Sequence, residues 1–420
     1  MRDKPDGQPS VIVVGGGPAG LTAAIALADA GIATVLVGMR PQRPDNRTTA
    51  LFAGSIAALQ TLGVWPLCAA QAAPLKIMRI VDDTGRLWRA PEVKFAAEEI
   101  GLEAFGYNIE NFHLLAALEQ RATTLTSLRI IEDEVRSVTP GEDAVAITLK
   151  SGARLHAPLL VAADGRRSLC RDAAGIAVDA REYPQAALTV CLKHTRPHCD
   201  TSTEFHTPSG PFTLVPLPGL RTSVVWVLAP AQADRFKALS DAELAPEIER
   251  ASHSILGKIT VEPGRGLFPL SVATARHFGA KRIALVGEAA HVIPPIGAQG
   301  LNLGLRDAAS IGEVAVAAER DGRDIGGNDV LAAYETMRRA DVASRTLAID
   351  LLNRTLLTDF LPVQGMRGLG LYMIDRIGPL RRAVMREGVQ PAAAAPRLMR
   401  GEALSAAVPT GPHPRGHRSR

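Results

Sequence analysis

The stretch VIVVGGGPAG at residues 11–20 limits the possible folds of this chain more than any other. The β-branched run at its start predicts a buried strand, and the alanine-rich residues 21–30 behind it predict a helix. Between them stand Gly15, Gly17 and Gly20, in the spacing of a turn that binds a dinucleotide. The first glycine permits the tight turn, the second lets a pyrophosphate approach the backbone, and the third lets helix and strand pack closely. We therefore predict a strand–turn–helix unit with a nucleotide at its turn.

One residue that usually accompanies this turn is missing. A second strand is expected at residues 34–37, and an acidic residue at the end of that strand normally binds the ribose hydroxyls. Here the position is Gly38, followed by Met39 and Arg40. We expect either another ribose contact or weaker binding of the nucleotide.

A second glycine-bearing turn occurs in VAADGRRSLCR, at residues 161–171. Asp164 and Gly165 stand at the end of a strand predicted at residues 159–163, and an Asp-Gly pair in this place marks a tight turn. Alone the turn carries no functional meaning, but its presence in the same chain as the first motif gives it weight.

The third stretch, GEAAHVIPPIGAQGLNLGLRD, occupies residues 287–307 between a strand predicted at 282–286 and a helix predicted at 301–320. Its prolines fix the backbone and its glycines admit a closely approaching ligand. A helix N-terminus at this place would stabilise negative charge, such as the charge on the pyrimidine ring of a reduced flavin. A structural corner alone would explain the bend, but not three separated glycines and Asn302.

Composition argues against some classes of function. Of the 420 residues, 46% are hydrophobic and 21% are charged, which is typical of a globular protein. Aromatic residues make up only 4%, and the net charge of +4 is mild, so no nucleic-acid partner is expected. We find no signal peptide, membrane span or cysteine framework, and we expect a reduced, cytoplasmic protein.

The rest of the chain divides by its periodicity. Residues 180–272 alternate as strands and indicate a second domain. Helices are predicted at residues 50–63 and 111–123, and a hairpin broken at PGED is predicted over residues 128–149. From residue 390 onward Ala, Pro, Gly and Arg dominate, which predicts a frayed tail.

Taken together, GGGPAG, DGRRSLCR and GEAAHVIPPIGAQGLNLGLRD resemble the motif set of FAD-dependent aromatic-ring monooxygenases with the para-hydroxybenzoate hydroxylase fold. Three further stretches resemble the ubiquinone-biosynthesis hydroxylases within that family: NRTTALFAGSIAALQTLGVW, FGYNIENFHLLAAL and GPFTLVPL. The resemblance runs in the expected order from residue 11 to about residue 385, and the set of three motifs is highly specific.

The resemblance implies an α/β fold in which a Rossmann-like FAD-binding domain is interrupted by a β-sheet substrate domain and followed by C-terminal helices. The FAD-binding domain is expected at residues 8–85, 107–178 and 275–345, and the substrate domain at residues 86–106 and 179–274. The C-terminal helices are expected at residues 346–390, and a flexible tail at residues 391–420.

The resemblance also implies the residues that bind the cofactor, which are Gly15, Gly17, Ala19, Gly20, Arg47, Asp164, Arg171, Glu288, Pro295, Gly297, Gly300, Leu301 and Asn302. The glycine turn and Arg47 would hold the phosphates, and Asp164, supported by Arg171, would lie between FAD and the nicotinamide donor. Glu288 would bind the ribityl chain, where the family usually has Asp, and residues 300–302 would face the isoalloxazine ring. We assign no catalytic residue and no metal ligand.

The chemistry of the family implies that NAD(P)H reduces FAD, which then uses O2 to place a hydroxyl group on an electron-rich phenol ring. The implied substrate is a polyprenylated phenol of ubiquinone biosynthesis. Two alternatives stay open. One is a flavoprotein hydroxylase of a soluble aromatic compound, and the other is a non-catalytic scaffold of a membrane-associated biosynthetic complex, which Gly38 and Glu288 keep in consideration.

Residues 351–385 mix apolar side chains with arginines. This composition suits docking on the inner face of an anionic membrane that holds a polyprenylated substrate, and it equally suits a helix packed on the FAD-binding domain. We keep both interpretations, and with the first we expect contact with other ubiquinone-biosynthesis proteins.

Histidines and cysteines raise one further alternative. The stretch CLKHTRPHC has Cys191, His194, His198 and Cys199 at a spacing that zinc sites use. Because a strand points neighbouring side chains to opposite faces, we favour no metal there. His291, beside the third motif, is expected either to contact substrate or to be a hydrogen-bonded structural residue.

Overall fold

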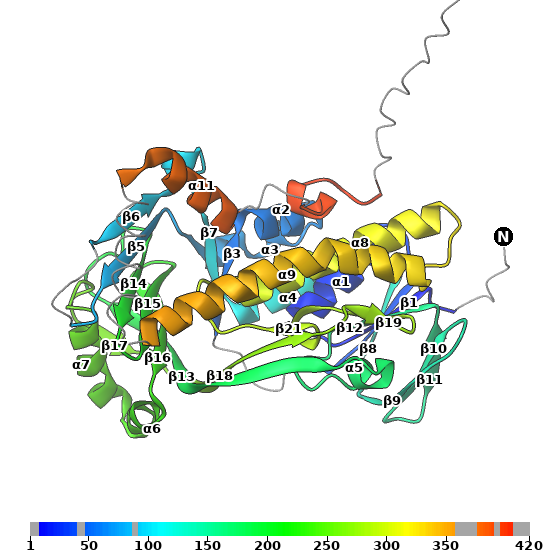
Figure 1. Cartoon of the computed structure of the whole chain (residues 1–420), viewed down its shortest axis with the longest axis horizontal. Helices are drawn as coiled ribbons and strands as arrows, with labels where there is room; N and C mark the ends of the chain where they lie inside the picture. The colour runs from blue at the N-terminus through cyan, green and yellow to red at the C-terminus, as the bar shows by residue number, and fades with distance from the viewer. Residues whose placement is uncertain (1–7, 40–46, 86–90, 358–375, 390–394, 406–420) are drawn as a thin grey trace, which may run out of the picture.

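The computed structural model describes residues 8–39, 47–85, 91–357, 376–389 and 395–405. It contains two large sheets (Figure 1), with the six-stranded sheet at one end and the nine-stranded sheet at the other. The long helices α8 (Gln299–Arg320) and α9 (Asn328–Leu357) run across the molecule between the two ends.

The six-stranded sheet has the order β19-β20-β12-β1-β2-β8 and is parallel apart from its edge strand β19. Every residue of β1, β2 and β12 is buried, as expected for parallel strands covered on both faces. The strands are β1 (Val11–Val14), β2 (Thr34–Val37), β8 (Leu128–Ile131), β12 (Leu159–Ala162), β19 (Gly279–Ala280) and β20 (Ile283–Leu285).

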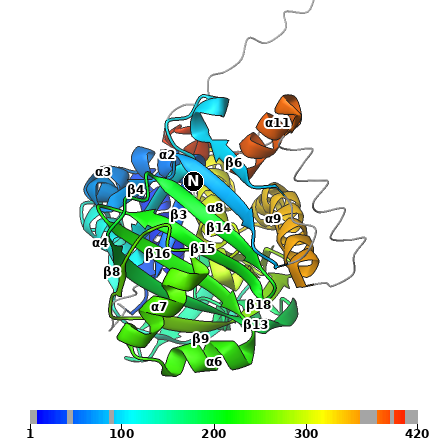
Figure 2. The same ribbon diagram turned by 90° about the vertical axis from the view of Figure 1, so that its left-hand side faces the viewer.

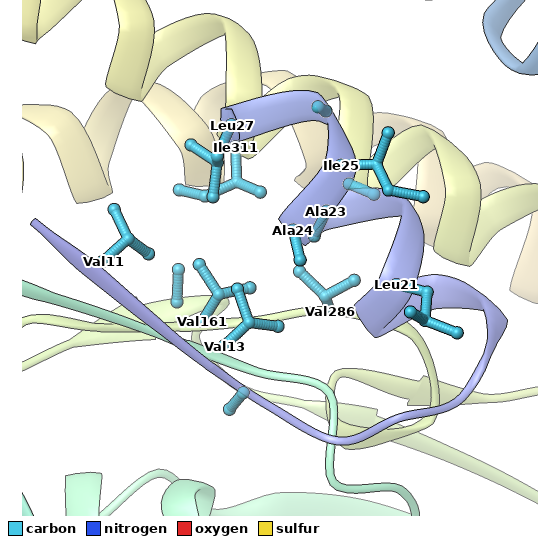
Figure 3. Packing of buried hydrophobic residues seen from close by; sticks show 14 of the residues in the cluster. Val11, Val13, Leu21, Ala23, Ala24, Ile25, Leu27, Val161, Val286 and Ile311 are labelled. Carbon is cyan, nitrogen blue, oxygen red and sulfur yellow. The ribbon is translucent and has the colours of Figure 1, made fainter. Parts of the chain in front are cut away.

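Helix α1 (Pro18–Asp29) covers this sheet and packs against α8. Figure 3 shows Leu27 of α1 and Ile311 of α8 in the same apolar cluster as Val13 and Val161, which are register partners on β1 and β12. The other helices of this part are α2 (Ala53–Thr61), α3 (Trp65–Cys68), α4 (Asn111–Ala122) and α5 (Leu169–Ala174), with the 3-10 helices η1 (Ala69–Gln71) and η3 (Gly287–Ala289).

The nine-stranded sheet has the order β21-β18-β13-β16-β15-β14-β5-β6, and β17 pairs with β13. One of its faces packs on α6 (Pro230–Ala238) and α7 (Asp241–Ala251), which Figure 2 shows at this end of the molecule. The strands are β5 (Ile77–Asp82), β6 (Val93–Ala96), β13 (Val178–His194), β14 (Thr201–Thr207), β15 (Gly210–Leu217), β16 (Arg221–Leu228), β17 (Ile259–Val261), β18 (Gly266–Ala275) and β21 (His291–Val292).

Two three-stranded sheets complete the described structure. The first joins β3 (Thr48–Phe52), β7 (Gly106–Glu110) and β4 (Ala72–Pro74), and the second joins β9 (Val135–Pro140), β10 (Val145–Leu149) and β11 (Arg154–Ala157). The remaining elements are η2 (Ala97–Ile100), α11 (Gly378–Val389) and η4 (Arg397–Arg400).

Two predicted elements are wrong because long-range pairing decides their structure. Residues 50–52 begin the predicted helix 50–63, but they are paired with β7 as the end of β3, so the helix starts at Ala53. Residues 128–131 are not part of the predicted hairpin, because β8 pairs in parallel with β2. The hairpin itself consists of β9 and β10.

The predicted frayed tail is also wrong over residues 395–405. There η4 packs on α2 and α8, and the side chains of Leu398, Met399 and Leu404 are buried. The other residues after 389 lie outside the described structure.

The predicted domain boundaries stay a prediction. The parallel pairing of β5 with β14 places residues 77–82 in the nine-stranded sheet. This pairing favours an earlier end for the first FAD-binding segment than residue 85.

Candidate cofactor and substrate site

A cavity of about 710 Å³ lies between the two large sheets. Its lining includes the N-terminus of α1, strand β3, the second glycine turn, the loop of residues 293–301 and one face of the nine-stranded sheet. Of the predicted site residues, nine line the cavity: Gly17, Ala19, Gly20, Arg47, Glu288, Pro295, Gly297, Gly300 and Leu301. The other four, Gly15, Asp164, Arg171 and Asn302, stand behind this lining.

The first glycine turn is closely packed. Gly15 has φ of +119°, and a Cβ atom there would lie 2.1 Å from the carbonyl oxygen of Ala163. A Cβ atom at Gly20 would lie 2.0 Å from the carbonyl oxygen of Gly15. Both distances are far below van der Waals contact, so the turn accepts only glycine at these positions.

Helix α1 presents its N-terminus to the cavity without a side-chain cap. Gly17 is the N-cap, Pro18 follows it, and the first turn contains no acidic residue. The first N–H groups of a helix have no partner within the helix, and they carry positive partial charge. Because Gly17 also lines the cavity, this end can bind a phosphate group there.

Gly38 has a structural reason to be glycine. A Cβ atom at this position would lie 2.4 Å from the backbone nitrogen of Gly16. The residue that was expected to be acidic therefore lies directly against the glycine turn, and any side chain there would displace the turn.

A second helix N-terminus reaches the same cavity. Gly297 and Ala298 have φ of +67° and +52°, and they turn the chain into α8, whose N-cap Ala298 makes no side-chain hydrogen bond. The first turn of α8 has no acidic residue, and Gly300 and Leu301 line the cavity. Two uncapped helix ends on one cavity fit a ligand with negative charge at two separate places.

The side chain of Asn302 is committed to the protein itself. Its Oδ1 accepts hydrogen bonds from Phe52 N at 3.0 Å and from Ser55 Oγ at 2.7 Å. Its Nδ2 donates to the carbonyl oxygens of Ala50 at 2.8 Å and Ala298 at 2.7 Å. All of its hydrogen-bonding capacity is used to fasten the start of α8 to the junction of β3 and α2.

Asp164 and Arg171 also act within the protein in this structure. The carboxylate of Asp164 accepts hydrogen bonds from Ser168 Oγ at 2.6 Å and from Cys170 N at 3.1 Å. Arg171 donates to the carbonyl oxygens of Arg166 and Ala289, each at 3.0 Å. Arg171 therefore joins the second glycine turn to the third one, and its predicted supporting role beside the cofactor stays a prediction.

Glu288 and Arg47 lie on the lining with exposed side chains. Glu288 forms an ion pair with Arg166, with 3.1 Å between Oε2 and Nε, and its side chain is 51% exposed. The guanidinium group of Arg47 lies over the ring of Phe268, 5.3 Å from its centroid. Both charged groups can turn toward a ligand in the cavity.

A buried charge network supports the third motif, and the sequence did not reveal it. Asp307 accepts hydrogen bonds from Gly287 N at 2.9 Å, from His291 Nε2 at 2.6 Å and from Arg338 Nε at 2.6 Å. Burial favours a raised pKa for Asp307, but the neighbouring His291 and Arg338 outweigh it and hold that pKa below its ordinary value. His291, on β21, is thus a hydrogen-bonded structural residue, and it is not among the residues that line the cavity.

Comparison with known proteins identifies the family. The FAD binding domain family matches residues 8–348. The chain belongs to this family. FAD is therefore its cofactor, as predicted, and the uncapped ends of α1 and α8 fit an anionic dinucleotide with a flavin at its far end.

Its relatives span nearly the whole chain. Ubiquinone hydroxylase UbiL of Rhodospirillum rubrum is 35% identical over 408 residues, covering 94% of this chain and 93% of its own. The 3-demethoxyubiquinol 3-hydroxylase of Escherichia coli is 33% identical over 389 residues, covering 90% of this chain and 98% of its own. The predicted membership among flavin-dependent hydroxylases is confirmed.

The fold is confirmed by solved structures. The crystal structure of p-nitrophenol 4-monooxygenase PnpA from Pseudomonas putida matches with a TM-score of 0.74 at 20% identity, covering 90% of this chain and 97% of that chain. The predicted α/β architecture, with an FAD-binding part and a second sheet, agrees with this similarity.

The sheet wall of the cavity consists of two rows of side chains. The first row, on strands β13, β16, β15, β14 and β5, is Thr189, Val225, Thr213, Glu204 and Ile80. The second row, on the same strands, is Cys191, Ser223, Val215, Ser202 and Met78. Burial raises the pKa of Cys191 to about 12, so its thiol stays neutral at physiological pH.

The histidines of CLKHTRPHC have other partners. His194 lies 2.8 Å from the carbonyl oxygen of Arg196 and 3.0 Å from Thr222 Oγ1, and His198 Nε2 lies 3.0 Å from the carbonyl oxygen of Leu217. Within the described residues, no three His, Cys, Asp or Glu side chains are grouped as metal ligands.

Proposed function

We propose that this chain uses NAD(P)H and O2 to hydroxylate the aromatic ring of a polyprenylated phenol in ubiquinone biosynthesis. The observation that carries the proposal is that two relatives above 30% identity are named as hydroxylases of ubiquinone or its precursor and are matched over at least nine tenths of their length.

The cofactor-binding roles below are part of the proposal. When bound, FAD takes electrons from NAD(P)H and supplies an oxygen atom from O2. The turn of Gly15, Gly17 and Gly20 and the N-terminus of α1 hold the phosphates, together with Arg47. Ala19 lies between this turn and the third motif, since Gly287 and Gly304 both approach its Cβ atom closely.

The third motif holds the other end of the cofactor. Glu288 would exchange its ion pair with Arg166 for a hydrogen bond to the ribityl chain. Pro295, Gly297, Gly300 and Leu301 would hold the isoalloxazine ring, and the positive end of α8 would stabilise negative charge on that ring. Asn302 acts by holding this loop in place, and Asp164 and Arg171 shape the neighbouring turn that the nicotinamide approaches.

The cavity suits an aromatic ring with an apolar chain. Beyond the cofactor loop its lining includes Leu75, Met78, Ile80 and Phe95, next to a buried cluster that contains Phe52 and Phe105. Apolar side chains of this kind favour a prenyl chain over a charged substituent.

The experiment is turnover by the purified protein supplied with FAD. 2-Geranylphenol in detergent micelles, together with NADH or NADPH, should give a product heavier by one oxygen atom, and NAD(P)H oxidation should rise with the phenol. The mass must increase further when the reaction runs under ¹⁸O2. Turnover of soluble phenols alone would favour the hydroxylase of a soluble aromatic, and a protein that does not bind FAD would favour the scaffold.

We also propose peripheral contact with the inner face of an anionic membrane. Within the described residues no single helix is long and apolar enough to span a membrane; the helices Ala53–Thr61 and Trp65–Gln71 pass that test only as a pair bent by 108°. Exposed apolar side chains on α9 and around α11 support a surface contact, and they are Leu347, Leu351, Ile377, Leu380 and Val384. Co-sedimentation with phosphatidylglycerol vesicles tests the contact. The double substitution Leu347→Ser and Leu351→Ser should weaken the co-sedimentation. Co-purification of other ubiquinone-biosynthesis proteins tests whether partners share it.

A further inference from the structure

The sheet wall of the cavity carries a carboxylate that the proposed reaction has not yet used. Among the described residues that line the cavity, the acidic ones are Glu204 and Glu288. Glu288 lies in η3, beside the cofactor loop, and is paired with Arg166. Glu204 lies on β14 of the nine-stranded sheet, in the row that also contains Thr213 and Ile80.

Two neighbours hold the Glu204 carboxylate at the wall. Its Oε1 lies 2.9 Å from Nε2 of His206, and its Oε2 accepts a hydrogen bond from Thr213 Oγ1 at 3.4 Å. Because an ionised carboxylate only accepts hydrogen bonds, Nε2 of His206 carries the hydrogen. Residues two apart on a strand share one face, so both side chains point the same way from the sheet.

The second ring nitrogen of His206 has no hydrogen-bond partner among the described residues. The His206 side chain is 3% exposed, and its Nδ1 is buried without a hydrogen-bond partner among the described residues. With the hydrogen on Nε2, Nδ1 of the neutral ring has a free lone pair. The pair is therefore a carboxylate that a buried imidazole ring holds in place through its Nε2 hydrogen.

The other ionisable groups of the lining are not suited to accept a proton from a phenol. They are three arginines, which only donate, and the Cys191 thiol, which burial keeps neutral. Of the arginines, Arg79 is paired with Glu92 and Arg166 with Glu288. Glu204 is the acceptor that the described wall offers to the substrate ring.

We propose that Glu204 is the catalytic base that accepts the proton of the substrate's phenolic hydroxyl group, and that His206 is the positioning residue that orients it. The inference rests on the proposed ring hydroxylation. An unperturbed carboxylate does not ionise a resting phenol, because the two pKa values differ by about six units. Once an electrophilic oxygen atom bonds to the ring, however, the hydroxyl group becomes strongly acidic, and a carboxylate in contact takes its proton.

The step is balanced in atoms and electrons. A ring electron pair forms the new C–O bond, the phenolic O–H bond breaks, and its proton goes to Glu204, leaving a ring ketone. The hydrogen of the attacked ring carbon then leaves as a proton and the ketone oxygen takes up a proton, which restores the aromatic ring. Glu204 releases its own proton to the solvent of the cavity. The second oxygen atom of O2 leaves as water with the electrons of NAD(P)H.

Variants of Glu204 test the base directly. Glu204→Gln keeps the size and both hydrogen-bond contacts but cannot take the proton, so product formation from 2-geranylphenol should fall by about 10². FAD binding should be unchanged, and NAD(P)H should be oxidised without matching product. Glu204→Asp should recover part of the loss. Glu134→Gln, on the exposed pair with Lys150, is the matched control and should behave as the parent protein.

A second substrate distinguishes a catalytic base at Glu204 from a Glu204 that acts only in the structure of the site. A ring-fluorinated 2-geranylphenol that is ionised at the assay pH needs no base, so Glu204→Gln should slow it much less than it slows the parent phenol. An equal loss with both substrates, or no loss with either, overturns the proposal. His206→Gln should lower kcat with the parent phenol, leave KM within about twofold, and spare the fluorinated phenol.

A binding measurement is independent of turnover. By calorimetry, the FAD-loaded protein should bind 2-geranylphenol more tightly than its methyl ether, because Glu204 accepts the O–H hydrogen bond. Glu204→Gln should reduce this preference, and an unchanged preference contradicts the contact. If the parent protein shows the preference but hydroxylates no phenol, the proposed function fails while the contact stands.

Discussion

At the residue scale, close packing against the glycine turn explains why position 38 is occupied by glycine and not by an acidic residue. From the sequence, Gly38 in place of an acidic residue was expected to mean either another ribose contact or weaker nucleotide binding. In the structure, the backbone of Gly16 occupies the space that a side chain on Gly38 would need. The glycine turn and Gly38 are therefore best understood as one packed unit.

We predict that an acidic residue at this position harms the protein. Gly38→Ala should cost about 1–3 kcal/mol of unfolding free energy through steric overlap, and Gly38→Glu should cost at least as much and weaken FAD binding. Urea unfolding and FAD titration measure the two effects. Gly54→Ala is the matched control, since a Cβ atom there would lie an ordinary 3.6 Å from Met399 and should be tolerated. Tighter FAD binding by Gly38→Glu would contradict this account.

Asn302 gives a second prediction at this scale. Asn302→Asp keeps the size but turns a donor toward the carbonyl oxygens of Ala50 and Ala298 into an acceptor. The expected loss of unfolding free energy is about 2–4 kcal/mol at pH 7. Repulsion raises the pKa of the new carboxyl group in the folded state, so stability should recover partly as the pH falls and the group is protonated.

Asn328→Asp serves as the control for that substitution. Asn328 is exposed at the start of α9, where a negative charge is favourable, so the exchange should be neutral. A stable Asn302→Asp protein with pH-independent unfolding would show that the side chain does not fasten α8 to β3.

At the element scale, α8 joins the cofactor loop to the core. Its first turn borders the cavity, and in its third turn Asp307 holds the backbone of Gly287 and the side chains of His291 and Arg338. Arg338 in turn pairs with Asp341, which also binds Arg306. The strand, turn and helix of the third motif are thus fixed by one buried network between α8 and α9.

Removal of the Asp307 charge should reveal this network in the pH dependence of stability. The folded pKa of Asp307 is lowered, so its contribution is present above the unfolded pKa, near 4, and is lost as the pH falls through the folded pKa. Asp307→Asn should cost about 3–5 kcal/mol at pH 7, because the buried Arg338 loses one of its two carboxylate partners and keeps only Asp341. Below about pH 4 the difference from the parent protein should shrink.

Urea unfolding between pH 7 and pH 3 measures this difference. Part of the acid slope should remain in the variant, because the pKa of Asp341 is also lowered by the neighbouring arginines against the opposing effect of burial. Asp234→Asn, at an exposed position on α6, should follow the parent curve. A constant difference across this pH range would contradict the assigned ionisation of Asp307.

Elements whose structure depends on nearby residues could be predicted from the sequence, and elements that depend on pairing with distant residues could not. The strands at 11–14 and 34–37 were predicted correctly because short β-branched runs beside a glycine turn need no distant information. Residues 50–52 and 128–131 were misassigned because their pairing partners are remote in sequence. The glycine turn and the cofactor loop were found as motifs.

The rest of the site could not be predicted for the same reason. The side chain of Asn302 was recognised within a motif, but its partners at Ala50 and Phe52 lie 250 residues away or more. Glu204 stood out in no motif, and it becomes a site residue only when five strands bring one row of side chains together.

At the scale of the whole molecule, a triad of charged side chains helps to join the cofactor part to the sheet part. Arg221 on β16 donates to both oxygens of Glu110 at the end of β7, at 2.9 and 3.0 Å. It also donates to Glu262 at 2.7 Å. Because α4 follows β7 directly, this triad connects the nine-stranded sheet to the framework that carries the cofactor turn.

We predict that Arg221 stabilises the whole chain through the charges it neutralises. Arg221→Met should lower the unfolding free energy by about 3–5 kcal/mol, since the largely buried Glu110 and Glu262 lose their partner. Arg221→Lys should cost less, because the charge remains while the paired contact with Glu110 is lost. Hydrogen exchange should rise first in β7 and β16.

A triple variant decides whether the cost comes from the unpaired carboxylates or from the lost connection. Arg221→Met combined with Glu110→Gln and Glu262→Gln leaves no buried charge, and it should recover most of the stability of the parent protein. Hydrogen exchange at β7 and β16 should then approach the parent rate. If stability returns but exchange stays high, the triad holds the two parts in register rather than stabilising either one. If neither returns, packing around Arg221, and not its charge, is what joins the cofactor part to the sheet that presents the substrate.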